Sequence, residues 1–250
     1  MKKNNENKIK IIKFLNIKFF NVNESNFKNI IKKKGLFVFP AAPPLATLKQ
    51  GSLYHRSLIK SDLAFFDSGF FVLLLRFLKG IKVEKFSGYK FLNFFFSYIY
   101  SNKNIKILSI DPSKRASSVN KNYFKKLGVS KAYSYVAPFY NVNKILDYSL
   151  LNKIKKVKPN FIIINIGGGT QEILGLYIKK KIKFKTCILC TGAAISFFTK
   201  QQAPINNVID KLYLGWLFRL LYNPNIFFKR YLSAFKLISF VKKGNIKIVK

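Results

Sequence analysis

Residues 161–164 (FIII) are apolar without interruption and lead directly into the glycine-rich turn 165–170 (NIGGGT), which opens a helical pattern through Lys180. A short strand with no polar face is typical of a parallel sheet that helices cover on both sides. Short apolar runs and helical patterns alternate along most of the chain, with short connections between them and no internal repeat. The sequence therefore predicts an α/β fold, in which a mostly parallel sheet has helices on both faces.

The positions of apolar runs, caps and glycines give the expected elements. Strands are predicted within residues 9–20 and at 36–39, 63–66, 105–110, 161–164 and 187–190. Helices are predicted at 23–34, 45–60, 69–80, 112–127, 144–157 and 170–180. Asn23 is the expected N-cap of the first helix, Gly51 weakens the second, and residues 40–44 (PAAPP) are expected to form a rigid loop.

Three loops directly follow apolar strands, at residues 40–44, 67–69 and 167–172. In sheets of this kind ligands bind at the carboxyl ends of the strands, so these loops are the candidate sites. The turn of Gly167, Gly168 and Gly169 lets backbone N–H groups approach an anion at a helix N-terminus, although a tight structural turn has the same pattern. Gln171 and Glu172 lie in the first helical turn and can point into a cleft there, or Glu172 serves only as a partner of the helix dipole.

Asp67 ends the strand at 63–66 and precedes Ser68 and Gly69. An acid in this position is either the N-cap of the following helix or a carboxylate placed for general-base catalysis. Capping is the commoner role in general, and the position at the end of a buried strand favours catalysis.

Basic residues greatly outnumber acidic ones, with 46 Lys and Arg, 9 Asp and Glu, and a net charge of +37. The positive electrostatic field of such a chain attracts nucleic acid, anionic lipid headgroups or phosphorylated substrates. A His-rich zinc site is excluded because His55 is the single histidine, and a Ser-His-Asp triad would have to use it. Cys187 and Cys190 are interpreted as buried strand residues rather than a metal or redox pair. We expect no metal and no cofactor, and no nucleic-acid partner, because no known nucleic-acid-binding motif accompanies the charge.

The composition changes near residue 200, which divides the chain into a domain at 1–199 and a basic, aromatic-rich appendage at 200–250. The appendage contains Trp216, and its pattern at 224–240 fits a packed core helix and an interfacial membrane helix equally well. No run reaches the roughly 18 apolar residues that a spanning helix needs, and no secretory signal opens the chain. We expect a cytoplasmic protein bound peripherally to the inner face of the cell membrane, with the appendage contacting its anionic surface.

Several segments resemble, in the same order, motifs of the WecG/TagA/CpsF family of glycosyltransferases (glycosyltransferase family 26). The resemblance spans residues 37–231 and rests on 61–69 (SDLAFFDSG), 84–88 (EKFSG), 164–172 (INIGGGTQE), 191–194 (TGAA), 203–204 (AP) and 214–220 (LGWLFRL). It implies a Rossmann-like domain with a C-terminal helical appendage. It also implies an inverting, metal-independent transfer of an N-acetylmannosamine-like sugar from a UDP-sugar to a polyprenyl-diphosphate-linked acceptor, in the synthesis of cell-surface polysaccharide.

The same resemblance assigns roles to individual residues. The family's proposed base corresponds to Asp67, its arginine before the Ser-Gly pair to Lys85, and its appendage arginine to Arg219. The other implied substrate-binding residues lie in the same motifs, and they are Gly88, Gly167, Gly168, Gly169, Gln171 and Glu172. The chemistry of the residues agrees, because without a metal the charge of a leaving diphosphate must be met by backbone N–H groups, a helix N-terminus and cations.

The chain departs from the family at several of these positions. Residues 39–44 (FPAAPP) replace a Thr-x-Asn sequence, and Lys85 lacks the bidentate fork of an arginine. These changes leave the expected class of reaction, glycosyl transfer, unchanged. The expected donor is therefore given more generally, as a UDP-linked N-acetylhexosamine-type sugar. The alternative is a non-catalytic protein of the same fold that binds a UDP-sugar or anionic lipid, and a basic nucleic-acid-binding protein is a weaker one.

Overall fold

A nine-stranded sheet runs through the computed structural model, which describes residues 9–102, 104–202, 221, 224, 228 and 232–249. Its strands are β1 (Lys10–Phe14), β2 (Ile17–Asn21), β3 (Gly35–Val38), β4 (Leu63–Phe65), β5 (Lys106–Asp111), β6 (Lys131–Val136), β7 (Phe161–Ile164), β8 (Cys187–Cys190) and β9 (Ile246–Val249). They lie in the order β6-β5-β7-β8-β3-β4-β2-β1-β9. Strand β1 pairs antiparallel with β2 and β9, and the other neighbouring pairs are parallel. The predicted α/β class with a mostly parallel sheet is confirmed.

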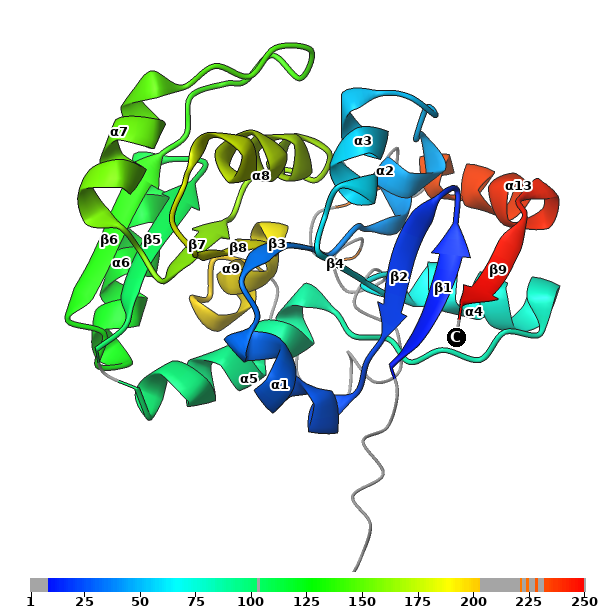
Figure 1. Cartoon of the computed structure of the whole chain (residues 1–250), viewed down its shortest axis with the longest axis horizontal. Coiled ribbons are helices and arrows are strands. Elements are labelled where there is room, and N and C mark those ends of the chain that lie inside the picture. The colour runs from blue at the N-terminus through cyan, green and yellow to red at the C-terminus, as the bar shows by residue number, and fades with distance from the viewer. Residues whose placement is uncertain are drawn as a thin grey trace, which may run out of the picture.

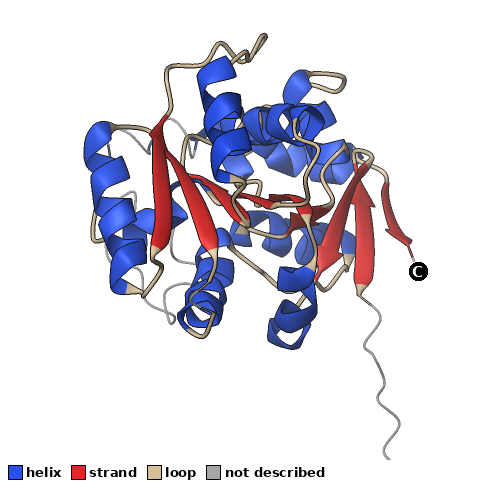
Figure 2. Ribbon diagram, turned by 60° about the vertical axis from the view of Figure 1, so that its left-hand side comes forward, coloured by secondary structure: helices blue, strands red, loops and turns tan. Residues whose placement is uncertain are grey.

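Helices lie on both faces of the sheet (Figure 2). They are η1 (Glu24–Asn26), α1 (Phe27–Lys32), α2 (Ala42–Ala46), α3 (Leu53–Ile59), α4 (Gly69–Lys79), α5 (Gly88–Tyr100), α6 (Lys114–Lys126), α7 (Tyr148–Val157), α8 (Thr170–Lys181), η2 (Gly192–Ala194), α9 (Ile195–Phe198) and α13 (Lys236–Lys243). Asn23 caps the first of them as expected, because its side chain accepts a hydrogen bond from the N–H of Asn26.

Alternating side chains of the central strands form two apolar layers. On β3, Leu36 and Val38 belong to one layer, and Phe37 belongs to the other. Helices α3, α4, α7 and α8 cover the first layer, and α1, α5 and α6 cover the second. The central strands are therefore buried on both faces, as the uninterrupted apolar runs predicted.

The helix expected at residues 45–60 is wrong as a single element, and so is the rigid loop before it. The chain instead forms α2 and α3, separated by a turn in which Gly51 has φ +79°. Pro43 and Pro44 lie in the first turn of α2, where a missing N–H removes no intrahelical hydrogen bond. Ser52 then begins α3 by accepting a hydrogen bond from the N–H of His55.

The end of the chain returns to the sheet, where β9 pairs with β1 (Figure 1). Just before it, α13 packs against α4 and buries Leu237 and Val241 completely. The domain boundary between residues 199 and 200 stays a prediction, and Trp216 lies outside the described residues. Within those that the structure does describe, no helix combines the length and the apolar character required to cross a membrane.

Candidate active site

Asp67 lies just beyond the carboxyl end of β4, and its carboxylate is fixed by the start of another helix. The N–H of Gly88, the first residue of α5, donates to Asp67 Oδ1 at 2.8 Å. The N-cap of α4 is instead Ser68, whose Oγ accepts from the N–H of Phe71 at 3.2 Å. Asp67 is therefore not the cap of the helix that follows it, and its half-buried carboxylate lies at the positive end of α5.

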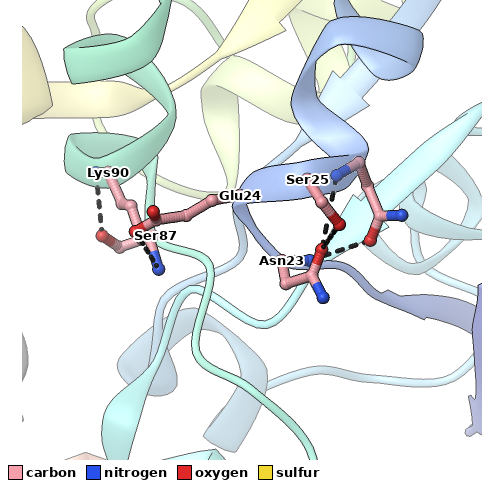
Figure 3. Close-up of polar contacts among 6 residues, drawn as sticks. Asn23, Glu24, Ser25, Ser87 and Lys90 are labelled. Atoms are coloured by element: carbon pink, nitrogen blue, oxygen red, sulfur yellow. Dashed lines mark hydrogen bonds and ion pairs between the residues drawn. The ribbon is translucent and has the colours of Figure 1, made fainter.

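The start of α5 is held in place from two sides. Ser87 caps it, and Lys90 in its first turn forms an ion pair with Glu24 of η1 at 3.3 Å (Figure 3). A side chain on Gly88 would meet the backbone of Thr191, since a Cβ there would lie 3.3 Å from the Thr191 carbonyl oxygen. Lys85 lies half-buried in the connection leading to this helix. The structure thus brings Asp67, Lys85 and Gly88 to one region of the carboxyl edge.

The turn at residues 167–169 follows β7 and opens α8, as predicted. Gly167 and Gly168 are exposed, and Gly169 has φ +91°, a conformation that favours glycine. The N–H of Gly169 donates to Glu172 Oε2 at 2.7 Å, so the chain itself provides the anion for this amide. Gly167 and Gly168 are the exposed residues of the turn.

The side chain of Gln171 does not point into a cleft, so that expectation is wrong, and for Glu172 the structure supports the alternative of a partner at the helix N-terminus. They are 3% and 0% exposed, because each side chain hydrogen-bonds inside the protein. Gln171 Oε1 accepts from the N–H of Gly192 at 2.7 Å, and its Nε2 donates to Glu172 Oε1 at 3.0 Å. The pair joins the turn after β7 to the loop after β8.

The environment of Glu172 changes its protonation. Burial raises its pKa from 4.5 to about 7, against the effect of hydrogen bonds from backbone amides and Gln171, and the charge of Asp67 adds to the rise. Asp67 and Glu172 come from loops far apart in the sequence, and they act on each other electrostatically across the carboxyl edge.

A cavity of about 380 Å³ and another of about 440 Å³ are open to solvent. The larger one lies at the carboxyl edge, beside the glycine turn, and its walls include Pro44, Thr47, Tyr54, Gly168, Gly169 and Ser233. The smaller one lies at the amino ends of the strands, between Lys34 and Phe161, away from the site described above. The larger cavity has a size typical of small-molecule sites.

Tyr54 of α3 lines the site and was not predicted, because no pattern in the sequence marks it. Its hydroxyl is buried and has no hydrogen-bond partner among the residues that the structure describes. Burial raises the pKa of Tyr54 well above its ordinary value, and the charges of Glu172 and Asp67 act in the same direction. Tyr54 is therefore a neutral phenol that lines the larger cavity.

Asp111 was also not predicted as a residue of the site. It is the last residue of β5, and Asp67 has a similar place just beyond the end of β4. Asp111 is completely buried, and it accepts hydrogen bonds from Ser109, Asn120 and Asn165 at 2.7–2.8 Å. Burial raises its pKa, and these hydrogen bonds oppose the rise. An acid at the end of a buried strand is the sequence signal that could have identified Asp111.

The remaining candidates have structural roles or lie outside the described residues. His55 joins α3 to the β1–β2 turn, with Nε2 2.8 Å from the carbonyl oxygen of Leu15. Cys187 and Cys190 are free and buried in β8, as predicted. In the described part of the chain no three His, Cys, Asp or Glu side chains gather as a metal site would require. Arg219 lies outside that part.

A doubly covered, mostly parallel sheet with polar groups at the carboxyl ends of its strands is characteristic of Rossmann-like α/β proteins, which bind ligands at that edge. The family model described as "Glycosyl transferase WecG/TagA/CpsF family" matches residues 12–247, and the chain belongs to this family. It is therefore a glycosyltransferase of cell-surface polysaccharide biosynthesis, and the resemblance seen in its motifs is confirmed. No curated protein matches the chain.

Proposed function

We propose that the protein is an inverting, metal-independent transferase that moves an N-acetylhexosamine-type sugar, similar to N-acetylmannosamine, from a UDP donor to a polyprenyl-diphosphate-linked sugar. Membership of the family supports the class of reaction. The scarcity of acids, 9 against 46 basic residues, supports anionic substrates and a site that uses cations rather than a carboxylate-bound metal.

The observation that carries the proposal is the position of Asp67. Its carboxylate is fixed at 2.8 Å from the N–H of Gly88, it is half-buried, and it acts electrostatically on Tyr54 in the wall of the larger cavity. A carboxylate held in this way is suited to accept the proton of the acceptor hydroxyl while that oxygen attacks the anomeric carbon.

The leaving UDP needs compensation for the charge that develops on its diphosphate. We assign to it the amides of the exposed residues Gly167 and Gly168 and the N-terminus of α8, together with Lys85. We assign Arg219 to the acceptor diphosphate, as the family motif implies. No step in this scheme needs a metal.

The test is a screen of UDP-sugars for UDP release that depends on a polyprenyl-diphosphate-linked acceptor, run with and without EDTA. We expect one N-acetylhexosamine donor to give acceptor-dependent release that EDTA leaves unchanged. UDP binding in calorimetry without release from any donor would instead indicate a non-catalytic binding protein. A rate that collapses with EDTA and recovers with Mg²⁺ or Mn²⁺ would refute the metal-free mechanism.

Asp67→Asn tests the base directly. The asparagine keeps an oxygen that accepts from Gly88, so the fold and UDP affinity should stay unchanged while transfer falls by about 10²–10⁴-fold. Ser68→Ala is the matched control, since it removes the α4 cap at a cost of about 1 kcal/mol in stability and should retain transfer. A rate above roughly a third of wild type for Asp67→Asn would place the base elsewhere.

A further inference from the structure

We propose that Gln171 and Glu172 are positioning residues, whose side chains tie the turn after β7 to the loop after β8 and thereby hold the helix N-terminus that orients Asp67. The proposal rests on the proposed function, since it gives Asp67 the role of the base. It assigns to this pair a role in the alignment of Asp67 in place of the substrate contact expected from the sequence.

The donors and acceptors of the pair form one continuous series. The N–H of Gly192 donates to Gln171 Oε1, the Gln171 amide donates to Glu172 Oε1, and the N–H of Gly169 donates to Glu172 Oε2. One amide and one carboxyl thus connect two backbone N–H groups, and neither side chain has more than 3% of its surface exposed. A buried side chain in such a series is costly to change, because a lost partner leaves an unsatisfied polar group.

The loop after β8 connects the pair to Asp67. Gly192, held by Gln171, directly follows Thr191, and the backbone of Thr191 packs against Gly88 so closely that an added Cβ would lie 3.3 Å from its carbonyl oxygen. The N–H of Gly88 then binds Asp67 Oδ1 at 2.8 Å. A shift of the loop after β8 therefore moves the amide that orients the proposed base.

Such a shift should affect the rate of transfer more than the binding of the donor. A displacement of about 1 Å at a reacting group costs about 10²-fold in rate, while the binding of the donor elsewhere in the site is retained. Damage to the pair should consequently lower kcat and leave the KM for the donor nearly unchanged. A residue that contacts the donor itself would raise KM.

The series of hydrogen bonds allows an exchange experiment. In Gln171→Glu two carboxyl groups face each other, so they either repel as carboxylates or bind a proton between them. In Glu172→Gln one amide N–H₂ must face another N–H donor. Each single variant therefore disrupts the original series of donors and acceptors. In the double variant Gln171→Glu/Glu172→Gln the carboxylate accepts from Gly192 and from the new glutamine, which itself accepts from Gly169. The double variant restores the full series with the two groups exchanged.

The four proteins are compared in acceptor-dependent UDP release and in hydrogen exchange of the Gly88 amide, with Lys180→Gln at the exposed end of α8 as control. We expect each single variant to lower kcat by about 10- to 100-fold with the donor KM within about twofold, and to raise the Gly88 exchange rate about tenfold or more. The double variant should return both quantities to within about threefold of wild type. The control should match wild type.

Two results would overturn the proposal. One is a raised donor KM with unchanged kcat in the single variants, which would assign the pair to substrate binding. The other is a double variant that is folded and yet no better than the single ones in kcat and in Gly88 exchange. If the wild type releases no UDP with any donor, the proposed function fails, and the exchange of Gly88 across the four proteins still decides whether the pair positions this amide.

Discussion

Glu172 has a carboxyl group with no exposed surface in the first turn of α8. The helix N-terminus and the hydrogen bonds from Gly169 and Gln171 favour the charged form, and the loss of water favours the neutral form. Burial is the larger effect, since the pKa rises to about 7. The folded protein therefore keeps a proton that the unfolded chain releases at lower pH.

Stability should consequently depend on pH in a definite direction. Between pH 4.5 and about 7 the folded state binds more protons than the unfolded state, so the free energy of unfolding falls as pH rises through this window. A difference of one unit in pKa corresponds to about 1.4 kcal/mol, which gives a fall of roughly 3 kcal/mol. Urea unfolding across the window measures it.

Glu172→Gln should remove this part of the pH dependence, whereas Glu24→Gln, at an exposed carboxylate, should keep it. Asp111, whose pKa burial also raises, contributes with the same sign in every variant, so the difference between variants isolates Glu172. Equal slopes for wild type and Glu172→Gln would show that this carboxyl is not the source.

The sequence identified Asp67, because an acid at the end of a buried strand is visible in the pattern of residues. It did not decide between cap and base, since Ser68 follows directly and either side chain can reach the N–H groups of α4. The direction of Gln171 was not predictable either. A side chain in a first helical turn can point to solvent or toward the sheet, and the N–H of Gly192 that binds it comes from a loop 21 residues later in the chain.

Helix α8 packs unusually closely on the sheet at Gly175. A Cβ there would lie 2.6 Å from Leu36 Cδ1 of β3 and 2.9 Å from Cys190 Sγ of β8. This glycine therefore sets the height of α8 above β3 and β8, and with it the position of the glycine turn that opens the helix.

Gly175→Ala should destabilise the protein in spite of the better helix propensity of alanine. The propensity gain is about 1 kcal/mol, and overpacking of a filled core costs about 1–3 kcal/mol, so we expect a net loss of up to about 2 kcal/mol. Thermal or urea unfolding measures it beside Lys180→Ala on the exposed side of the same helix, which should change stability little. A stabilised Gly175→Ala variant would mean that α8 is free to move outward.

The elements with uninterrupted apolar runs or clear end signals were the predictable ones. Strand β7 and helix α4 agree with their predicted positions because uninterrupted apolar runs and a C-terminal glycine mark them. Strands β6 and β9 and helix α5 were not predicted. In β6 the single buried residue is Ala132, so the strand has almost no apolar alternation. Strand β9 is fixed by its pairing with β1, which lies far from it in the sequence.

The charge of the whole chain and the apolar groups near its end favour an anionic membrane surface, which we retain as a proposal. Leu232 and Phe235 are 52% and 58% exposed in the segment leading into α13, and this helix ends with Lys242 and Lys243. Exposed apolar groups beside lysines are typical of interfacial segments, although α13 also buries Leu237 and Val241 against the core.

Binding to anionic vesicles should therefore have two components. The electrostatic one contributes about 1 kcal/mol for each basic residue near the surface, so the bound fraction should fall as salt rises from about 0.05 M to about 0.5 M. The apolar component should persist at high salt and decrease in Leu232→Gln/Phe235→Gln, but not in Tyr133→Gln on the distant strand β6. Co-sedimentation measures both, and equal binding to neutral and anionic vesicles at low salt would contradict the electrostatic component.

The pairing of β9 with β1 also has a consequence for biosynthesis. A ribosome releases β1 and β2 early, but the strand that covers the free edge of β1 follows only after nearly all of the remaining sequence. At about 5–20 residues per second that edge stays open for many seconds, during which it can pair with another nascent chain. Lys10 and Lys13 in β1 place positive charge on this edge, and repulsion between two such strands would protect the growing polypeptide until its own partner arrives.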